Sequence, residues 1–219
     1  MTTRLRLGVL VSGSGSNLQA LLDACAQADF PAEVAVVVSN KPDAFALERA
    51  RRAGVPTRVL EHKGFADREA FDLALLAALR EAGVELVCLA GFMRLLGRGF
   101  IEAYAGRILN IHPSLLPAFP GLHAQRQALE RGVKVAGCTV HFVDSGTDTG
   151  PIIAQAAVPV LPSDDEAALA ARILVEEHRL YPLAVRLVAS GAVTLEAGRT
   201  RVSATPTLGE LSLRCPGRA

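Results

Sequence analysis

The N-terminal half of the chain alternates short aliphatic runs with segments of helical periodicity, and this alternation is the strongest constraint on the fold. Four aliphatic runs predict strands over residues 5–11, 34–38, 57–60 and 84–90. Between them, apolar residues recur with helical spacing, as at Leu18, Leu21, Leu22 and Cys25. Strands that are almost entirely aliphatic are typical of parallel sheets, because helices cover both of their faces. We therefore expect an α/β fold with an open, mostly parallel twisted sheet and helices on both faces.

The second half of the chain indicates a smaller C-terminal lobe of the same domain. Further strands are expected over residues 108–111, 135–143 and 152–160, and a short helix over 124–131. Ser163 and Glu166 have the spacing of a capping box that opens a long helix, in which Pro182 should introduce a kink or an end. Residues 1–197 are expected to form one domain, with halves of about 1–100 and 101–197. Residues 198–219 are polar and arginine-rich, and we expect a flexible tail there.

Composition excludes several classes of protein. Half of the 219 residues are hydrophobic, which excludes general disorder, and the formal net charge is only +1. Nucleic acids and anionic membranes need a broad cationic surface, so neither is expected as the main partner. No apolar run approaches the roughly 18 residues of a membrane span, and we expect no signal peptide. Four scattered cysteines without a CxxC pair indicate reduced thiols, and we expect a cytoplasmic enzyme.

A turn rich in glycine and serine, residues 13–17, separates the first predicted strand from the first predicted helix. Glycines permit positive φ and a close approach of backbone amides to a ligand, and a helix N-terminus attracts anions. This combination favours a phosphate site, with a tight turn capped by Ser16 or Asn17 as the alternative. A dinucleotide fingerprint would need a glycine where Leu18 stands, and the Gly-Lys-Ser/Thr sequence of a P-loop is absent.

The sequence Asn110-Ile111-His112-Pro113 ends the predicted strand over 108–111. Alternation places Asn110 and His112 on the same face, and Pro113 turns the chain out of the sheet. Ligands of open parallel sheets bind at this end of the strands. An amide beside an imidazole suits acyl transfer, because the amide can stabilise an oxyanion while the imidazole moves protons. The alternative is that His112 is an ordinary residue at a strand end.

A second polar loop, residues 144–150, contains two carboxylates. Either Asp144 or Asp148 can lie near His112, where a carboxylate would orient the imidazole, and the sequence alone does not choose between them. The histidines and aspartates at 112, 123, 141, 144 and 148 also offer metal ligands. Their spacing matches no known ligand pattern, so no metal site is expected.

Four blocks of sequence carry a resemblance to a known family. They are Val-Ser-Gly-Ser-Gly-Ser-Asn-Leu-Gln-Ala at 11–20, Leu-Ala-Gly-Phe-Met-Arg-Leu-Leu at 89–96, Leu-Asn-Ile-His-Pro-Ser-Leu-Leu-Pro at 109–117 and Phe-Pro-Gly-Leu-His at 119–123. In content and order they closely resemble the phosphoribosylglycinamide formyltransferases, over about residues 5 to 190. The resemblance implies a Rossmann-like formyltransferase fold with an antiparallel strand in the C-terminal lobe. It also implies a catalytic group of Asn110, His112 and Asp148.

The resemblance further implies two sets of binding residues. The substrate phosphate and ribonucleotide would contact Gly15, Ser16, Asn17, Leu174, Val175, Glu176 and Glu177. The folate would contact Arg68, Met93, Arg94, Leu95, Leu96, Asn110, Asp144, Ser145, Gly146, Thr147 and Asp148. From the residues alone, Arg68 is equally well explained as a surface arginine paired with a neighbouring carboxylate, and Glu177 as an exposed helix carboxylate. Ser14 stands where the family often has Asn, and Thr149 where it often has Gly.

The implied reaction is transfer of a formyl group from 10-formyltetrahydrofolate to the amine of glycinamide ribonucleotide in purine biosynthesis. Asn110 and protonated His112 would stabilise the tetrahedral oxyanion while Asp148 orients His112, and no metal is implied. The partners would be these two small molecules, with a homodimer left open. The nearest alternative is a 10-formyltetrahydrofolate hydrolase, which shares the three residues. A methionyl-tRNA formyltransferase would need a basic C-terminal domain, and a non-catalytic phosphate-binding module is the alternative of a different class.

Overall fold

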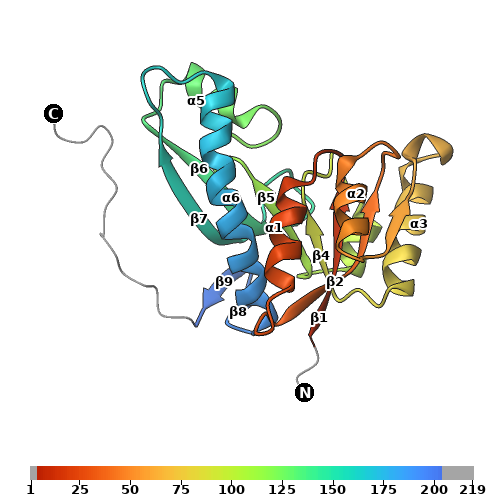
Figure 1. Ribbon diagram of the computed structural model, residues 1–219. Helices are drawn as coiled ribbons and strands as arrows, with labels where there is room; N and C mark the ends of the chain where they lie inside the picture. The colour runs from red at the N-terminus through yellow and green to blue at the C-terminus, as the bar shows by residue number, and fades with distance from the viewer. Residues whose placement is uncertain (1–3, 204–219) are drawn as a thin grey trace. The chain divides into compact units, whose positions relative to one another are not determined.

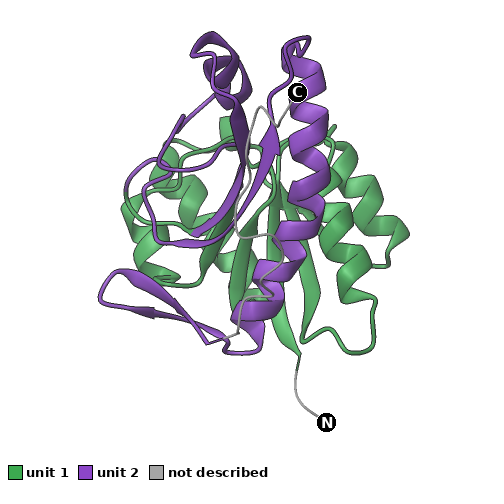
Figure 2. Ribbon diagram, turned by 90° about the vertical axis from the view of Figure 1, so that its left-hand side faces the viewer, with its two compact units in different colours: residues 1–110, 142–145 green, residues 111–141, 146–219 purple. Residues whose placement is uncertain are grey.

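The computed structural model describes residues 4–203, which form two compact units (Figure 2). Unit 1 contains the residues up to Asn110 and the segment Phe142–Ser145. Unit 2 contains Ile111–His141 and the described residues from Gly146 onward. The halves expected from the sequence meet near residue 100, whereas the units divide inside strand β5 (Ile108–His112).

Unit 1 is built on parallel strands in the order β3-β2-β1-β4-β5. Figure 1 labels all of these strands except β3. Besides β5, these strands are β1 (Leu5–Val11), β2 (Ala32–Ser39), β3 (Thr57–Val59) and β4 (Leu86–Leu89). Its helices are α1 (Ser16–Cys25), α2 (Phe45–Arg52), α3 (Arg68–Glu81) and α4 (Arg98–Ala103), with a 3-10 turn at His62–Gly64.

Helices cover both faces of the strands in unit 1. On one face, Leu10 lies in a buried cluster with Phe71 of α3 and Phe100 of α4. Alternation assigns the fully buried Val9 and Val11 to the other face. On that side α1 and α2 pack against each other and against β2.

Unit 2 pairs β6 (Val135–Phe142) with β7 (Ile152–Pro159) in antiparallel register. Its helices are α5 (Ala124–Glu130) and α6 (Glu166–Ala189), and an antiparallel hairpin of β8 (Val193–Glu196) and β9 (Arg199–Val202) follows. The larger sheet has the strand order β3-β2-β1-β4-β5-β6-β7. The predicted fold, a mostly parallel sheet with helices and an antiparallel strand in the C-terminal part, is therefore confirmed.

Three local expectations in the C-terminal part differ from the structure. Asp165 is the N-cap of α6 and its side chain accepts a hydrogen bond from Ala168 N, so the capping box expected at Ser163 does not form the cap. α6 continues through Pro182 to Ala189, because buried residues on both sides of the proline hold the helix in place. The flexible tail expected over residues 198–219 does not hold for residues 199–202, which form β9, and residues 204–219 of that expectation lie outside the described residues.

Candidate active site

A buried polar network joins three segments at the carboxyl edge of the strands in unit 1. Ser12, directly after β1, donates a hydrogen bond from Oγ to Asn40 Oδ1 over 2.6 Å. The same Oγ accepts a hydrogen bond from Met93 N over 2.8 Å. Ser12 and Asn40 are both buried. Ligands of open α/β sheets bind at this edge, so the network supports the backbone where a ligand is expected.

The glycine-rich turn leads directly into α1. Gly15 is the N-cap residue and has the left-handed conformation, with φ of 71°. A Cβ on Gly15 would lie 2.5 Å from the Cβ of Ala46, so both the dihedral angle and the available space require glycine. Ser16 and Asn17 are the first two residues of the helix. The predicted phosphate residues therefore lie at a helix N-terminus, where the amides of the first turn and the helix dipole favour an anion.

The predicted folate segment that begins at Met93 is held at both ends. Met93 N donates to Ser12, and Gly97 N donates to Asp72 Oδ2 over 2.6 Å. Between these bonds, the side chains of Met93 and Leu95 are 61% and 67% exposed. A fixed backbone with exposed apolar side chains is suited to contact with an aromatic ligand.

Asp72 of α3 belongs to this part of the site, although no motif predicts it. It is 5% exposed, and its Oδ1 has no hydrogen-bond partner among the described residues. Burial raises the pKa of Asp72, and this effect outweighs the Gly97 hydrogen bond and the charges of Arg68 and Arg94, which lower it. A cavity of about 310 Å³ lies beside the carboxylate and is lined by Arg68, Gly97 and Phe100 among others. The available sequence signal is an acidic residue on the buried, otherwise apolar face of α3.

In unit 2, the buried His112 is paired with Asp148, which is largely but not fully buried. His112 Nδ1 lies 3.3 Å from Asp148 Oδ2, and the two side chains are 6% and 14% exposed. Asp148 Oδ2 also accepts a hydrogen bond from Gly121 N over 2.8 Å. The other carboxylate oxygen lies 3.7 Å from Nε2 of the buried His141. Asp148, one of the two carboxylates that the sequence left open, is therefore placed to orient His112.

The second nitrogen of the His112 ring also has an oxygen neighbour. His112 Nε2 lies 2.9 Å from the carbonyl oxygen of Phe119. A carbonyl and an ionised carboxylate accept hydrogen bonds but donate none. Both nitrogens of the His112 ring therefore face oxygen acceptors.

Side chains of β6 and β7 hold the loop that follows His112. Thr139 Oγ1 donates to Ser114 O over 2.7 Å and accepts from Leu116 N over 3.0 Å. Gln155 Nε2 donates to Leu116 O over 2.9 Å. These bonds fix the loop that brings oxygen and amide groups to the His112–Asp148 pair.

The predicted ribonucleotide residues on α6 differ in exposure. Val175 is 50% exposed, and Glu176 forms an ion pair of 2.8 Å with Arg179. Glu177 is 7% exposed, so it is not the ordinary exposed helix carboxylate that the sequence allowed. Glu177 lies near Cys138 of β6, where burial raises the pKa of the thiol to about 12 and the charges of the two glutamates add to the rise.

The predicted residues are divided between the two units. Unit 1 contains Gly15, Ser16, Asn17, Arg68, Met93, Arg94, Leu95, Leu96, Asn110, Asp144 and Ser145. Unit 2 contains His112, Gly146, Thr147, Asp148 and residues 174–177. Asn110 and His112 share β5, where alternation gives them the same face.

The remaining expectations concern metals, membranes and cysteines. Among the described residues, no group of three His, Cys, Asp or Glu side chains could hold a metal ion. No helix within residues 4–203 combines the length and hydropathy of a membrane span. Cys25, Cys88 and Cys138 are buried and form no disulfide bond, and Cys215 lies outside the described residues.

Known proteins share both the sequence and the architecture of this chain. Residues 5–185 match the formyl transferase family. The phosphoribosylglycinamide formyltransferase of Escherichia coli is 49% identical over 191 residues, covering 87% of this chain and 90% of that protein. The crystal structure of glycinamide ribonucleotide transformylase 1 from Symbiobacterium toebii is similar with a TM-score of 0.89 and 59% identity, covering 91% of this chain and 94% of that one.

A longer relative contains a segment of the same kind. The trifunctional purine biosynthetic protein adenosine-3 of Drosophila pseudoobscura is 55% identical over 193 residues. The match covers 87% of this chain, and the chain spans only 14% of that protein's length. The resemblance predicted from the four sequence blocks is confirmed. The chain belongs to the formyl transferase family.

Proposed function

We propose that the chain transfers the formyl group of 10-formyltetrahydrofolate to the amine of glycinamide ribonucleotide. The observation that carries this proposal is the pairing of Asp148 with the buried His112, which ends the strand that also contains Asn110. The choice of substrates is supported by the Escherichia coli relative, which is named phosphoribosylglycinamide formyltransferase.

Asn110 and His112 carry the donors that formyl transfer requires. When the amine nitrogen attacks the formyl carbon, the formyl oxygen takes up the negative charge of a tetrahedral centre. Hydrogen bonds from the His112 ring and the Asn110 amide stabilise this oxygen. As the centre collapses, the bond from the formyl carbon to N10 of the folate breaks, and the proton lost by the amine passes to N10. His112, oriented by Asp148, is the group placed to carry that proton.

The Nε2 atom of His112 is the ring nitrogen left for the substrate, since Asp148 holds Nδ1. The Phe119 carbonyl now accepts from this nitrogen. We expect the formyl oxygen to replace that carbonyl when the substrates bind.

The binding residues of unit 1 fit the two substrates. The exposed Met93 and Leu95 can pack on the aromatic rings of the folate, and Arg68 and Arg94 supply positive charge for its carboxylates. The N-terminus of α1 at Gly15 suits the phosphate of the ribonucleotide.

The test is an assay that separates transfer from hydrolysis. Deformylated folate is followed with both substrates present, and again without glycinamide ribonucleotide. Transfer predicts folate release only with the amine, in equal amount to formylated ribonucleotide. Equal release without the amine would instead identify a 10-formyltetrahydrofolate hydrolase. Ligand-induced thermal stabilisation without any turnover would identify a non-catalytic binding module.

A further inference from the structure

Helix α2 contacts three consecutive residues of the glycine-rich turn. Gly13 O accepts a hydrogen bond from Ala46 N over 3.1 Å. Ser14 O accepts one from Arg49 Nε over 2.9 Å. Gly15 packs so closely on Ala46 that it has no room for a Cβ. The conformation of the turn is therefore set from the side of α2.

These two bonds also set the direction of two peptide groups. In a trans peptide the C=O of one residue and the N–H of the next point in opposite directions. Because α2 holds the carbonyls of Gly13 and Ser14, the amides of Ser14 and Gly15 point away from α2. Neither amide donates to a protein acceptor within residues 4–203. Two such amides directly before a helix N-terminus are suited to bind an anion.

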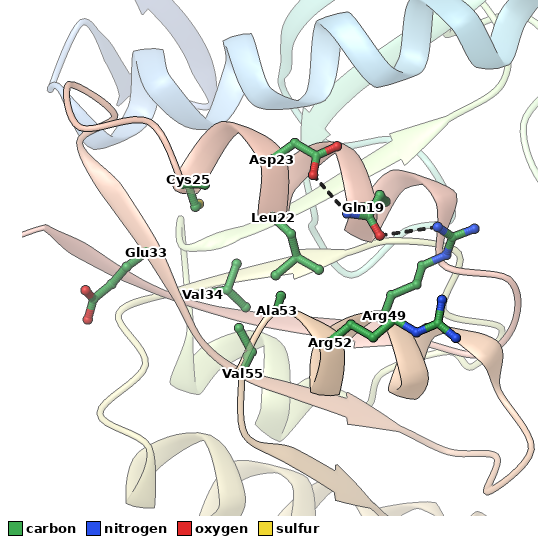
Figure 3. Close-up of a pocket in the computed structure, with 11 residues that line it drawn as sticks. Gln19, Leu22, Asp23, Cys25, Glu33, Val34, Arg49, Arg52, Ala53 and Val55 are labelled. Carbon is green, nitrogen blue, oxygen red and sulfur yellow. Dashed lines mark hydrogen bonds between the residues drawn. The ribbon is translucent and has the colours of Figure 1, made fainter.

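Arg49 is itself held in place by several contacts. Its Nη1 donates to Gln19 Oε1 of α1 over 3.2 Å, and Gln19 Nε2 donates to Asp23 Oδ1 over 2.8 Å (Figure 3). The Arg49 guanidinium also lies 5.0 Å from the centroid of the Phe45 ring. Arg49 therefore links α2, the turn and α1 along the edge of a cavity of about 530 Å³.

We propose that Arg49 is a positioning residue for the phosphate of the ribonucleotide. Through its bond to the Ser14 carbonyl, Arg49 turns the Gly15 amide toward the anion and holds it there. The inference rests on the proposed function, which assigns the phosphate to this turn. It adds a residue that no phosphate-binding motif contains.

Arg52 provides a matched control on the same helix. It lines the same cavity, and its guanidinium lies 5.9 Å from the centroid of the Phe45 ring. Its Nε pairs with Glu48 over 2.8 Å, and among the described residues it makes no hydrogen bond to the turn. Replacement of either arginine by alanine removes one positive charge, but only replacement of Arg49 removes the bond to Ser14.

The experiment is steady-state kinetics of Arg49→Ala, Arg49→Lys and Arg52→Ala, with each substrate varied in turn. We expect Arg49→Ala to raise the KM for glycinamide ribonucleotide about tenfold, because the amides that face the ionised phosphate lose their fixed orientation. The KM for 10-formyltetrahydrofolate should stay within about twofold. Arg49→Lys keeps the charge and one donor, so its KM should be intermediate. The KM of Arg52→Ala for glycinamide ribonucleotide should match that of the wild type. Inorganic phosphate should inhibit Arg49→Ala less strongly than it inhibits the wild type or Arg52→Ala.

The outcomes separate this inference from the function on which it rests. Equal changes of KM in Arg49→Ala and Arg52→Ala, or a fall in kcat alone, would overturn the role of Arg49. Failure of the phosphate assignment gives a different result: the wild type would then use the dephosphorylated ribonucleoside as efficiently as the ribonucleotide, and phosphate would not inhibit. If Arg49→Ala does not fold, Arg49→Lys against Arg52→Lys makes the same comparison with the charge retained.

Discussion

The glycine-rich turn of unit 1 and the His112 loop of unit 2 are built in opposite ways. In the turn, the groups that face the proposed ligand are backbone amides, and the Arg49 side chain holds a backbone carbonyl. At His112, the reactive groups are side chains, and the backbone of Phe119 and Gly121 contacts them. A site made of backbone should be sensitive to added atoms, whereas a site made of side chains should be sensitive to lost ones.

The largest effect is expected at the site made of side chains. His112→Asn should lower kcat by about 10²- to 10⁴-fold, because general acid–base catalysis by the ring is lost. Its thermal midpoint should stay close to that of the wild type, since an asparagine amide can still donate to Asp148. Kinetics and thermal unfolding of the same preparation test the fall in kcat and the unchanged thermal midpoint. His123→Asn is the control, since His123 is 63% exposed, and turnover in His112→Asn equal to that control would contradict the proposed role.

Asp148→Asn should reduce kcat less than the change at His112, by about 10- to 100-fold, because Asp148 acts through His112. Asparagine tolerates the φ of 55° at this position and can still accept from Gly121 N. Asp148→Ala should lose stability as well as activity, since the Gly121 amide and the imidazole would lose a partner. Kinetics and urea unfolding of Asp148→Asn and Asp148→Ala separate the effect of losing the charge from the effect of losing the hydrogen bond. Full activity in Asp148→Asn would show that the charge is not needed.

Gly15→Ala tests the sensitivity of the backbone site to added atoms. We expect a loss of about 2–4 kcal/mol in the free energy of unfolding, because a positive φ and a clash with Ala46 act together. Gly54→Ala is the control: Gly54 also has φ of 70°, but a Cβ there meets nothing within 4 Å. It should cost only about 1–2 kcal/mol. Equal losses in urea unfolding would show that the close contact between the turn and α2 does not matter.

The smallest effects concern two carboxylates whose pKa values are shifted in opposite directions. In unit 1, burial raises the pKa of Asp72. Above about pH 4, its ionisation therefore favours the unfolded chain, and the wild type loses stability as pH rises through the raised pKa. Asp72→Asn lacks this loss and can still accept from Gly97 N. Its thermal midpoint relative to the wild type should rise with pH over that window, and a constant difference would contradict the assignment.

The pKa of Asp164 in unit 2 is shifted in the opposite direction, so its contribution to stability should change with pH in the opposite sense. Its hydrogen bond from Arg172 lowers the pKa of Asp164 to about 2. The stability that this bond contributes is present above about pH 4 and is lost as pH falls toward 2. Asp164→Asn should therefore melt below the wild type at neutral pH and approach it near pH 2. Thermal midpoints of Asp72→Asn, Asp164→Asn and the wild type, measured as a function of pH, test both predictions.

The elements of the fold were predictable where the pattern is local and strong. The runs and periodicity around the glycine-rich turn predicted β1 and α1 to within a few residues. The predicted N-cap of α6 was wrong, because Ser163 and Asp165 are both good capping residues and the local sequence does not show which of them caps the helix. Of the kink or end expected at Pro182, the end does not occur, because burial of its neighbours outweighs the local preference.

The sequence by itself determined the alternation of strands and helices, the glycine-rich turn and the family, because each is a pattern of near neighbours in a fixed order. Only the tertiary structure decided that Asp148 lies beside His112, that Asp72 accepts a hydrogen bond from Gly97 N and that Arg49 holds the turn. The physical reason is that each of these contacts joins residues far apart in the chain, such as Arg49 and Ser14, which are separated by 35 positions. Periodicity and propensity describe neighbours, whereas such pairs are chosen by how the packed elements bring their side chains together.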